Sequence, residues 1–86
     1  MNKADRKRLS ELRYRLSCVG DELESITSEV EGIKDDEEAK VDNLPDSLQF
    51  SERAEDMREK IDILDDIVYA LSEIEISEIC DKFDEI

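Results

Sequence analysis

The sequence predicts an all-α fold, an antiparallel helical hairpin of coiled-coil type, and three observations lead to this prediction. Apolar residues recur every three or four positions over two long runs. The single proline, Pro45, lies near the middle of the chain and separates the runs. Positive charge gathers at one end of the chain and negative charge over the rest, so folding back brings opposite charges together. We expect one domain, residues 1–86.

The composition supports long helices over other fold classes. Charged residues make up 44% of the chain and hydrophobic residues 38%, with two glycines and no tryptophan. This mixture, combined with sustained apolar periodicity, is typical of coiled coils. A disordered acidic chain is the competing interpretation, but such a chain has no reason to phase its aliphatic residues so evenly.

The first helix is predicted over residues 3–40, with Asn2 as its N-cap. Its apolar seam follows a 3.5-residue repeat, which implies a left-handed supercoil. The predicted seam consists of Leu9, Leu12, Leu16, Val19, Leu23, Ile26, Val30 and Ile33. Gly20 and Gly32 are expected to lie off the seam. Four consecutive acids, 35–38, crowd like charges together, so the helix should end, or become frayed and exposed, between about Lys40 and Asn43.

Residues 42–51 are predicted to form the corner of the hairpin. We expect Asn43 to cap a short turn that carries Pro45 in its first turn, and Ser51 to cap the next helix. Leu48 and Phe50 lie outside any seam. They either close the end of the hairpin or form an exposed apolar tip where a partner docks.

The second helix is predicted over residues 52–75, and its apolar stripe is wider than one neighbour requires. Its seam consists of Ala54, Met57, Ile61, Leu64, Val68 and Leu71. Ile63, Ile67 and Ile74 lie beside this seam. Because a lone two-helix seam is marginally stable, we expect these three residues to form an oligomer interface, as in a homodimer that makes a four-helix bundle.

The apolar phase breaks near residue 75. The following stripe consists of Ile76, Ile79, Cys80, Phe83 and Ile86. Either a kink starts a short third helix over 76–86, or one helix continues and packs on a different partner. Ser72 and Glu75 match a capping box that would start such a helix.

The charge distribution points to a basic protein as the partner. Residues 1–15 carry six Lys or Arg against two acids, a net charge of +4, and residues 16–86 carry six against 24, a net charge of −18. An acidic chain is a poor ligand for nucleic acid or an anionic membrane. The acidic face predicted to bind the partner consists of Asp35, Asp36, Glu37, Glu38, Asp62, Asp65 and Asp66.

No residue pattern predicts an enzyme, a cofactor or a metal site. The chain has no histidine, so Cys18 and Cys80 lack a catalytic base, and we expect both to be reduced, buried small hydrophobes. Adjacent acids on a helix point apart, which argues against a cation site. Tyr14 and Tyr69 lie off the seams, either as surface residues or as interface anchors. With no 18-residue apolar run and no signal-peptide core, a cytoplasmic protein is expected.

The corner carries a motif that resembles a known group of proteins. Asn43-Leu44-Pro45-Asp46-Ser47-Leu48-Gln49 is followed by Ser51-Glu52-Arg53-Ala54-Glu55 and an acidic helix rich in Ile, Leu and Ala. Over roughly residues 35–75 the chain resembles small uncharacterised acidic helical proteins of phages and mobile elements of Gram-positive bacteria. The resemblance implies a bacterial host cell as the setting and no particular activity, and it does not include the basic end, Lys3–Arg15.

Two hypotheses for function follow. In the first, the acidic face binds and blocks a basic surface of a host nucleic-acid-handling or defence protein, as a DNA mimic does. In the second, the chain is a structural or assembly factor, and its acids only keep a coiled coil soluble. Binding by mimicry should weaken steeply with salt, whereas coiled-coil assembly should not.

Overall fold

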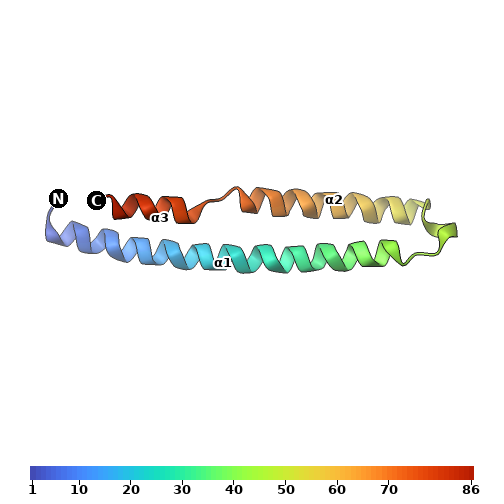
Figure 1. The fold of residues 1–86 in the computed structure, drawn as a ribbon, viewed down its shortest axis with the longest axis horizontal. Coiled ribbons are helices and arrows are strands. Elements are labelled where there is room, and N and C mark those ends of the chain that lie inside the picture. Colours follow the sequence, from blue (N-terminus) through green and yellow to red (C-terminus); the bar gives the residue numbers. More distant parts are fainter.

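The computed structural model describes the whole chain, Met1–Ile86, and confirms the all-α hairpin (Figure 1). Helix α1 (Lys3–Asp42) forms one layer. A short 3-10 helix, η1 (Asp46–Leu48), lies in the corner, and α2 (Glu52–Ser72) and α3 (Ile76–Asp84) lie end to end along α1 as the second layer. The two termini lie at the same end of a rod whose Cα extents are 70 × 14 × 13 Å.

The start of α1 is capped as expected, and its end is closed differently. The Asn2 side chain accepts a hydrogen bond from the Asp5 amide at 2.8 Å. α1 ends at Asp42, inside the predicted window of Lys40 to Asn43, and the Asn43 amide donates to the Ala39 carbonyl at 3.0 Å. The prediction that Asn43 caps the short turn is therefore wrong, since Asn43 closes α1 instead and η1 begins after Pro45 with no side-chain cap.

The second layer divides where the apolar phase breaks. The Ser51 hydroxyl accepts from the Ala54 amide at 3.2 Å and so caps α2. α2 ends at Ser72, three residues earlier than expected, and α3 begins at Ile76. The predicted capping box does not form. The Ser72 hydroxyl donates to the Tyr69 carbonyl at 2.7 Å instead, and no side chain caps α3.

The seam of α1 has the predicted 3.5-residue spacing in a different phase. We call the shielded residues that face the second layer the inner seam. On α1 they are Leu9, Arg13, Leu16, Gly20, Leu23, Thr27, Val30, Lys34, Glu37 and Val41. Leu12, Val19, Ile26 and Ile33, which the sequence placed in the seam, are 38% to 55% exposed. The prediction was wrong for these four because the apolar arc of α1 is wider than one neighbouring helix covers.

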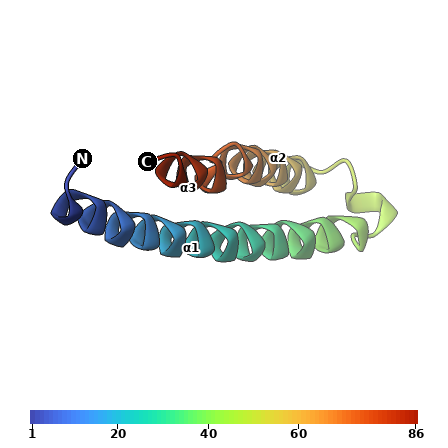
Figure 2. The same cartoon turned by 60° about the vertical axis from the view of Figure 1, so that its left-hand side comes forward.

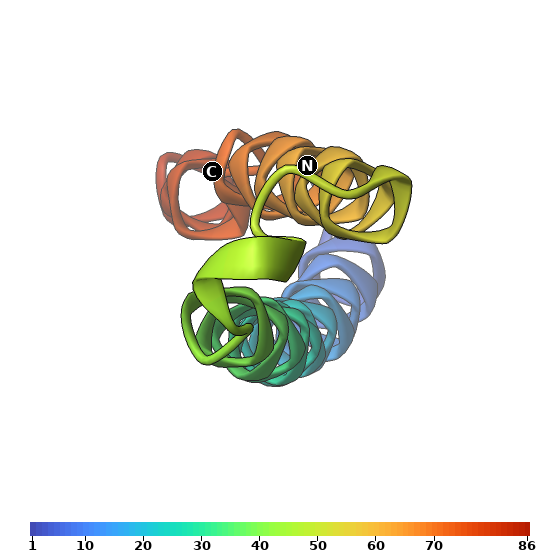
Figure 3. The same ribbon diagram turned by 90° about the vertical axis from the view of Figure 1, so that its right-hand side faces the viewer.

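The second layer contributes the residues expected for α2. Its shielded residues are Ala54, Met57, Ile61, Leu64, Val68 and Leu71 on α2, and Ile76, Cys80 and Phe83 on α3. The end-on view in Figure 3 shows the two layers winding around each other, as a 3.5-residue seam requires. Val41, Ala54 and Cys80 are the only buried residues. The hairpin therefore has a thin seam in place of a deep core.

Gly20 lies in the inner seam, contrary to expectation, at the closest approach of the two layers. A Cβ on Gly20 would lie 3.1 Å from Cγ2 of Ile76, the first residue of α3. Gly32 has nothing within 4 Å of such an atom. The absence of a side chain at residue 20 therefore lets α3 pack against α1 directly after the break.

The corner is held by Gln49 and Arg58. The Gln49 amide nitrogen donates to the carbonyls of Val41 (3.0 Å) and Leu44 (2.9 Å). The Arg58 guanidinium donates to the Gln49 carbonyl (2.7 Å) and to its Oε1 (2.9 Å). Phe50 is 89% exposed and Leu48 is also exposed, so these two residues do not close the hairpin end.

One cross-layer ion pair forms near the termini. The Arg13 Nε and Nη2 atoms donate to the two carboxylate oxygens of Asp84 at 2.8 and 3.0 Å. Folding back was expected to bring opposite charges together along this end, but the basic first turns of α1 form no ion pair with α3. The reason is that α3 ends opposite Arg13 and these turns project beyond it (Figure 2).

Alanine substitutions at the two glycines should separate helix propensity from packing. Gly32→Ala is expected to raise the free energy of unfolding by about 0.5–1 kcal/mol, since alanine is the better helix former and the position is open. Gly20→Ala gains the same propensity but forces Ile76 to move, so it should be less stable than Gly32→Ala by about 1 kcal/mol or more. Urea unfolding followed by circular dichroism measures both. Equal stabilisation would contradict the close approach at Gly20.

The corner hydrogen bonds can be tested by removing the amide of Gln49. Gln49→Leu keeps the size of the side chain but leaves the partners of the amide without it, so we expect a loss of about 1–3 kcal/mol in the free energy of unfolding. The neighbouring substitution Phe50→Ser is the control. It should change stability by no more than about 0.5 kcal/mol, because the ring is exposed. Thermal unfolding by calorimetry should rank the two variants in this order.

Candidate functional site

The hairpin has two long sides, one on either flank of the inner seam. Because successive residues of a helix are turned by about 100°, the residues just before and just after the seam rows of α1 lie on opposite flanks. The row before the seam consists of Leu12, Val19, Ile26 and Ile33. The row after it consists of Ser10, Ser17, Glu24, Glu31 and Glu38. One flank is thus apolar and the other polar, and in an antiparallel pair the second layer extends each of them.

The polar flank is strongly acidic over the half of the molecule near the corner. We call this surface the acidic side. Its members on α1 recur at steps of three, four or seven residues and are all exposed: Asp21, Glu24, Glu31, Asp35, Glu38 and Asp42. Its exposed members on α2 are Glu55, Asp62 and Asp65. Glu38 and Asp42 of α1 line one groove together with Arg58 and Asp62 of α2, so acids of both layers meet on this side.

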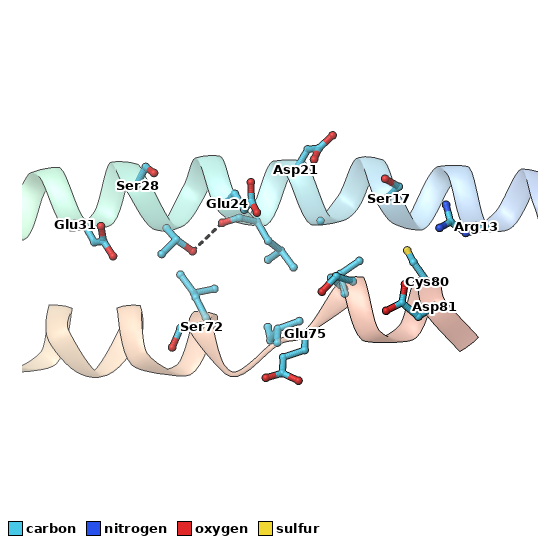
Figure 4. Close-up of a pocket in the computed structure, with 17 residues that line it drawn as sticks. Arg13, Ser17, Asp21, Glu24, Ser28, Glu31, Ser72, Glu75, Cys80 and Asp81 are labelled. Carbon is cyan, nitrogen blue, oxygen red and sulfur yellow. Dashed lines mark hydrogen bonds between the residues drawn. The ribbon is translucent and has the colours of Figure 1, made fainter. Parts of the chain in front are cut away.

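A larger groove of about 690 Å³ continues the same side across the break between α2 and α3 (Figure 4). Four serines line it, Ser17 and Ser28 from α1 and Ser72 and Ser77 from the second layer. Acids from both layers line it as well: Asp21, Glu24, Glu31, Glu75 and Asp81. A hydrogen bond with Glu78, and repulsion from that carboxylate, raise the pKa of Glu75 above its ordinary value of 4.5.

The structure brings together only part of the predicted acidic face. Asp35, Glu38, Asp62 and Asp65 lie on the acidic side. Asp36 and Asp66, each one residue further along its helix than an acidic-side residue, are turned away from it by about 100°. Glu37 lies in the inner seam, where its carboxylate accepts a hydrogen bond from Lys40 at 2.8 Å.

Few cations neutralise the acidic side. Lys34 reaches Asp65 at 3.0 Å, and this hydrogen bond and ion pair raise the lysine's pKa. Arg58 is engaged by Gln49 at the corner. The ion pairs within the chain include none of the other eight acids of this side. Their carboxylates are therefore available to an external cation.

The opposite flank carries the exposed aliphatic residues, and we call it the apolar side. It consists of Leu12, Val19, Ile26 and Ile33 of α1, Ile63 and Ile67 of α2, and Ile79 and Ile86 of the α3 end. Two of the three predicted interface residues, Ile63 and Ile67, belong to it. Ile74 lies in the break and lines the large groove, so it is separated from them. The sequence prediction missed the α1 row, although its repeat of seven residues was visible.

The cysteines lie outside both sides, whereas Tyr14 and Tyr69 lie on the polar flank, seven residues before Asp21 and seven residues after Asp62. Cys80 is buried as expected, whereas Cys18 is exposed, because its row faces away from the second layer. Both are free thiols. Tyr14 and Tyr69 are exposed. No group of three or more acidic or cysteine side chains is placed to hold a metal ion, and none of the helices combines the length and apolarity needed to cross a bilayer.

No protein-family model, curated protein or solved structure matches this chain.

Glu75→Gln tests the repulsion between Glu75 and Glu78. An acid whose pKa is raised by folding stabilises the fold fully below its unfolded pKa, and that contribution is lost as the pH rises through the folded pKa. The melting temperature of Glu75→Gln relative to the wild type should therefore be higher at pH 7 than at pH 4. Circular dichroism melts at both pH values measure this difference. A difference independent of pH would show that Glu75 and Glu78 do not interact.

Proposed function

We propose that this chain is a non-enzymatic interaction protein whose acidic side binds and blocks a basic surface of a nucleic-acid-handling or defence protein in the cytoplasm of a bacterial host cell. The observation that carries the proposal is the density of carboxylates on one side of a rod. From Asp21 to Asp42 the acidic side extends about 31 Å, at 1.5 Å per helical residue. Its eight acids without an internal ion pair give about one charge per 4 Å, near the phosphate spacing of about 3.4 Å along one DNA strand.

The scaffold suits such a role because the carboxylates are fixed on helix backbones. A surface that is already ordered loses little conformational entropy on binding. Eight of the nine carboxylates have no internal ion pair, so a basic partner need not displace an internal cation from them. A one-signed face also steers an oppositely charged partner during encounter. These properties support competition with a nucleic acid for the same basic surface.

A structural or assembly role is the second candidate, and the apolar side favours it. Eight exposed aliphatic residues on one flank form a surface of the kind that marks protein–protein contacts. We include in the proposal that the chain works as a homodimer or higher oligomer through this side. Since the two sides flank the inner seam in opposite directions, self-association leaves the acidic side free.

The experiment compares two triple variants that remove the same charge from different faces. Asp35→Asn/Glu38→Gln/Asp62→Asn alters the acidic side, and Glu59→Gln/Asp66→Asn/Glu73→Gln alters the outer row of the second layer. Immobilised proteins would capture binders from a bacterial lysate, and duplex DNA would be used to elute them. At about 0.2–1 kcal/mol per exposed charge contact, the first triple should weaken binding of the captured protein about threefold to a hundredfold. The second should bind like the wild type.

Two readouts decide between the candidate functions. Binding through the acidic side should be competed by DNA and should fall steeply with salt. If both triples bind equally, or if DNA releases nothing, the blocking function fails and the assembly role gains. Circular dichroism would first establish that both triples keep the helical content of the wild type.

A further inference from the structure

We infer that a second copy of this chain covers the apolar side, with the two α1 helices packed antiparallel so that residue i of one faces residue 45 − i of the other. The inference rests on the self-association included in the proposed function and is independent of the acidic side. It specifies the occupant of the surface, the orientation of the two copies and their register.

The apolar side has the size of a stable interface. α1 has 40 residues, which is about 60 Å at 1.5 Å per residue, and the rod is 14 Å wide. Such a face offers on the order of 800 Å² per copy, as in a standard protein–protein interface. Only three of 86 residues are buried in the single hairpin. A second copy would add the second neighbour that the wide apolar arc of α1 requires.

The α1 row of the apolar side matches itself when it is reversed. The row repeats every seven residues: Leu12, Val19, Ile26 and Ile33. Continuing the same repeat, an acid, Asp5, precedes it and a base, Lys40, follows it. Its midpoint, 22.5, is also the midpoint of α1, Lys3–Asp42. In the antiparallel arrangement Leu12 faces the partner's Ile33, Val19 faces the partner's Ile26, and Asp5 faces the partner's Lys40. Aliphatic residues thus meet aliphatic residues, and the two terminal contacts join opposite charges.

The neighbouring row of α1, on the rim of this side, shows the same complementarity. It consists of Arg8, Arg15, Glu22, Glu29 and Asp36. The arrangement places Arg8 near the partner's Asp36 and Arg15 near the partner's Glu29. Within this row only Glu22 lies near an identical charge, close to the twofold axis, and the same axis brings Glu75 of the second layer near its own copy. Because rim charges set orientation more than affinity, this row favours the antiparallel pairing.

The other symmetric arrangement stacks α1 on the second layer of the partner, and charge opposes it. Within one hairpin, facing residues have numbers that sum to about 97, as Arg13 with Asp84 and Gly20 with Ile76 show. The same sum would then relate the two copies. Arg15 would face the partner's Lys82, and Glu22 would face the partner's Glu75, so like charges would meet at both points. Like charges placed opposite each other select against a pairing.

Cysteine crosslinking tests the register in a Cys18→Ser/Cys80→Ala background. Glu22→Cys should form a disulfide-linked dimer with oxidised glutathione, because this position meets itself near the axis. Glu29→Cys, in the same row, should not crosslink to itself, because its two copies would lie about 21 Å apart along the axis. A mixture of Arg15→Cys and Glu29→Cys should crosslink. Crosslinking of Glu22→Cys only with Glu75→Cys would overturn the antiparallel pairing in favour of the alternative.

Sedimentation tests whether the copies associate at all. The wild type should sediment at twice the chain mass of 10.0 kDa, and Ile26→Glu should shift it to 10.0 kDa. Ser25→Glu is the matched control, since it adds the same charge one residue away on the exposed outer row and should remain dimeric. A wild-type monomer at micromolar concentration would overturn the inference. If that monomer still bound a basic partner through its acidic side, the blocking function would stand.

Discussion

The inner seam between α1 and the second layer is the contact on which the whole molecule depends. This seam is narrow. At several positions along it α1 contributes a polar or small residue: Arg13, Gly20, Thr27, Lys34 and Glu37. These residues let the two layers approach closely or form ion pairs between the layers, but they bury little apolar area. The aliphatic residues beside them remain exposed for that reason. A weak internal seam and an uncovered apolar side therefore have the same cause.

The sequence was sufficient to predict the elements but not the rotation of α1 about its axis. Leu9, Leu16, Leu23 and Val30 belong to both seam phases that a 3.5-residue repeat allows. Local hydrophobicity favours Leu12 over Arg13 as the intervening residue, yet Arg13 faces α3 because Asp84 pairs with it. Gly20 against Ile76 favours the same rotation. Such choices depend on the partner helix, whose register a single helical pattern does not contain.

In the corner and the acidic side, too, some features could be predicted from the local sequence and others depend on the folded chain. Pro45 indicates a turn and Ser51 indicates a helix start. Both signals depend on local chemistry, so they could be recognised from the sequence. The amide of Gln49 acts on Val41 and Leu44, and its role depends on how the chain has already folded. Runs of consecutive acids drew attention to residues 35–38, but a helix distributes such a run over several faces. Acids spaced by three or four residues, such as Asp21 with Glu24, were the better signal of a common surface.

The overhang of α1 beyond α3 has an electrical consequence. A chain with +4 near one tip and −18 over the rest of a 70 Å rod has a large dipole moment along its axis. Two copies packed head to tail would cancel that dipole, because the basic start of each α1 would lie beside the acidic residues near the partner's corner. A single hairpin would orient strongly in the field of a charged partner. The paired form would have no such net dipole, so its acidic sides would not be oriented along the rod axis in this way.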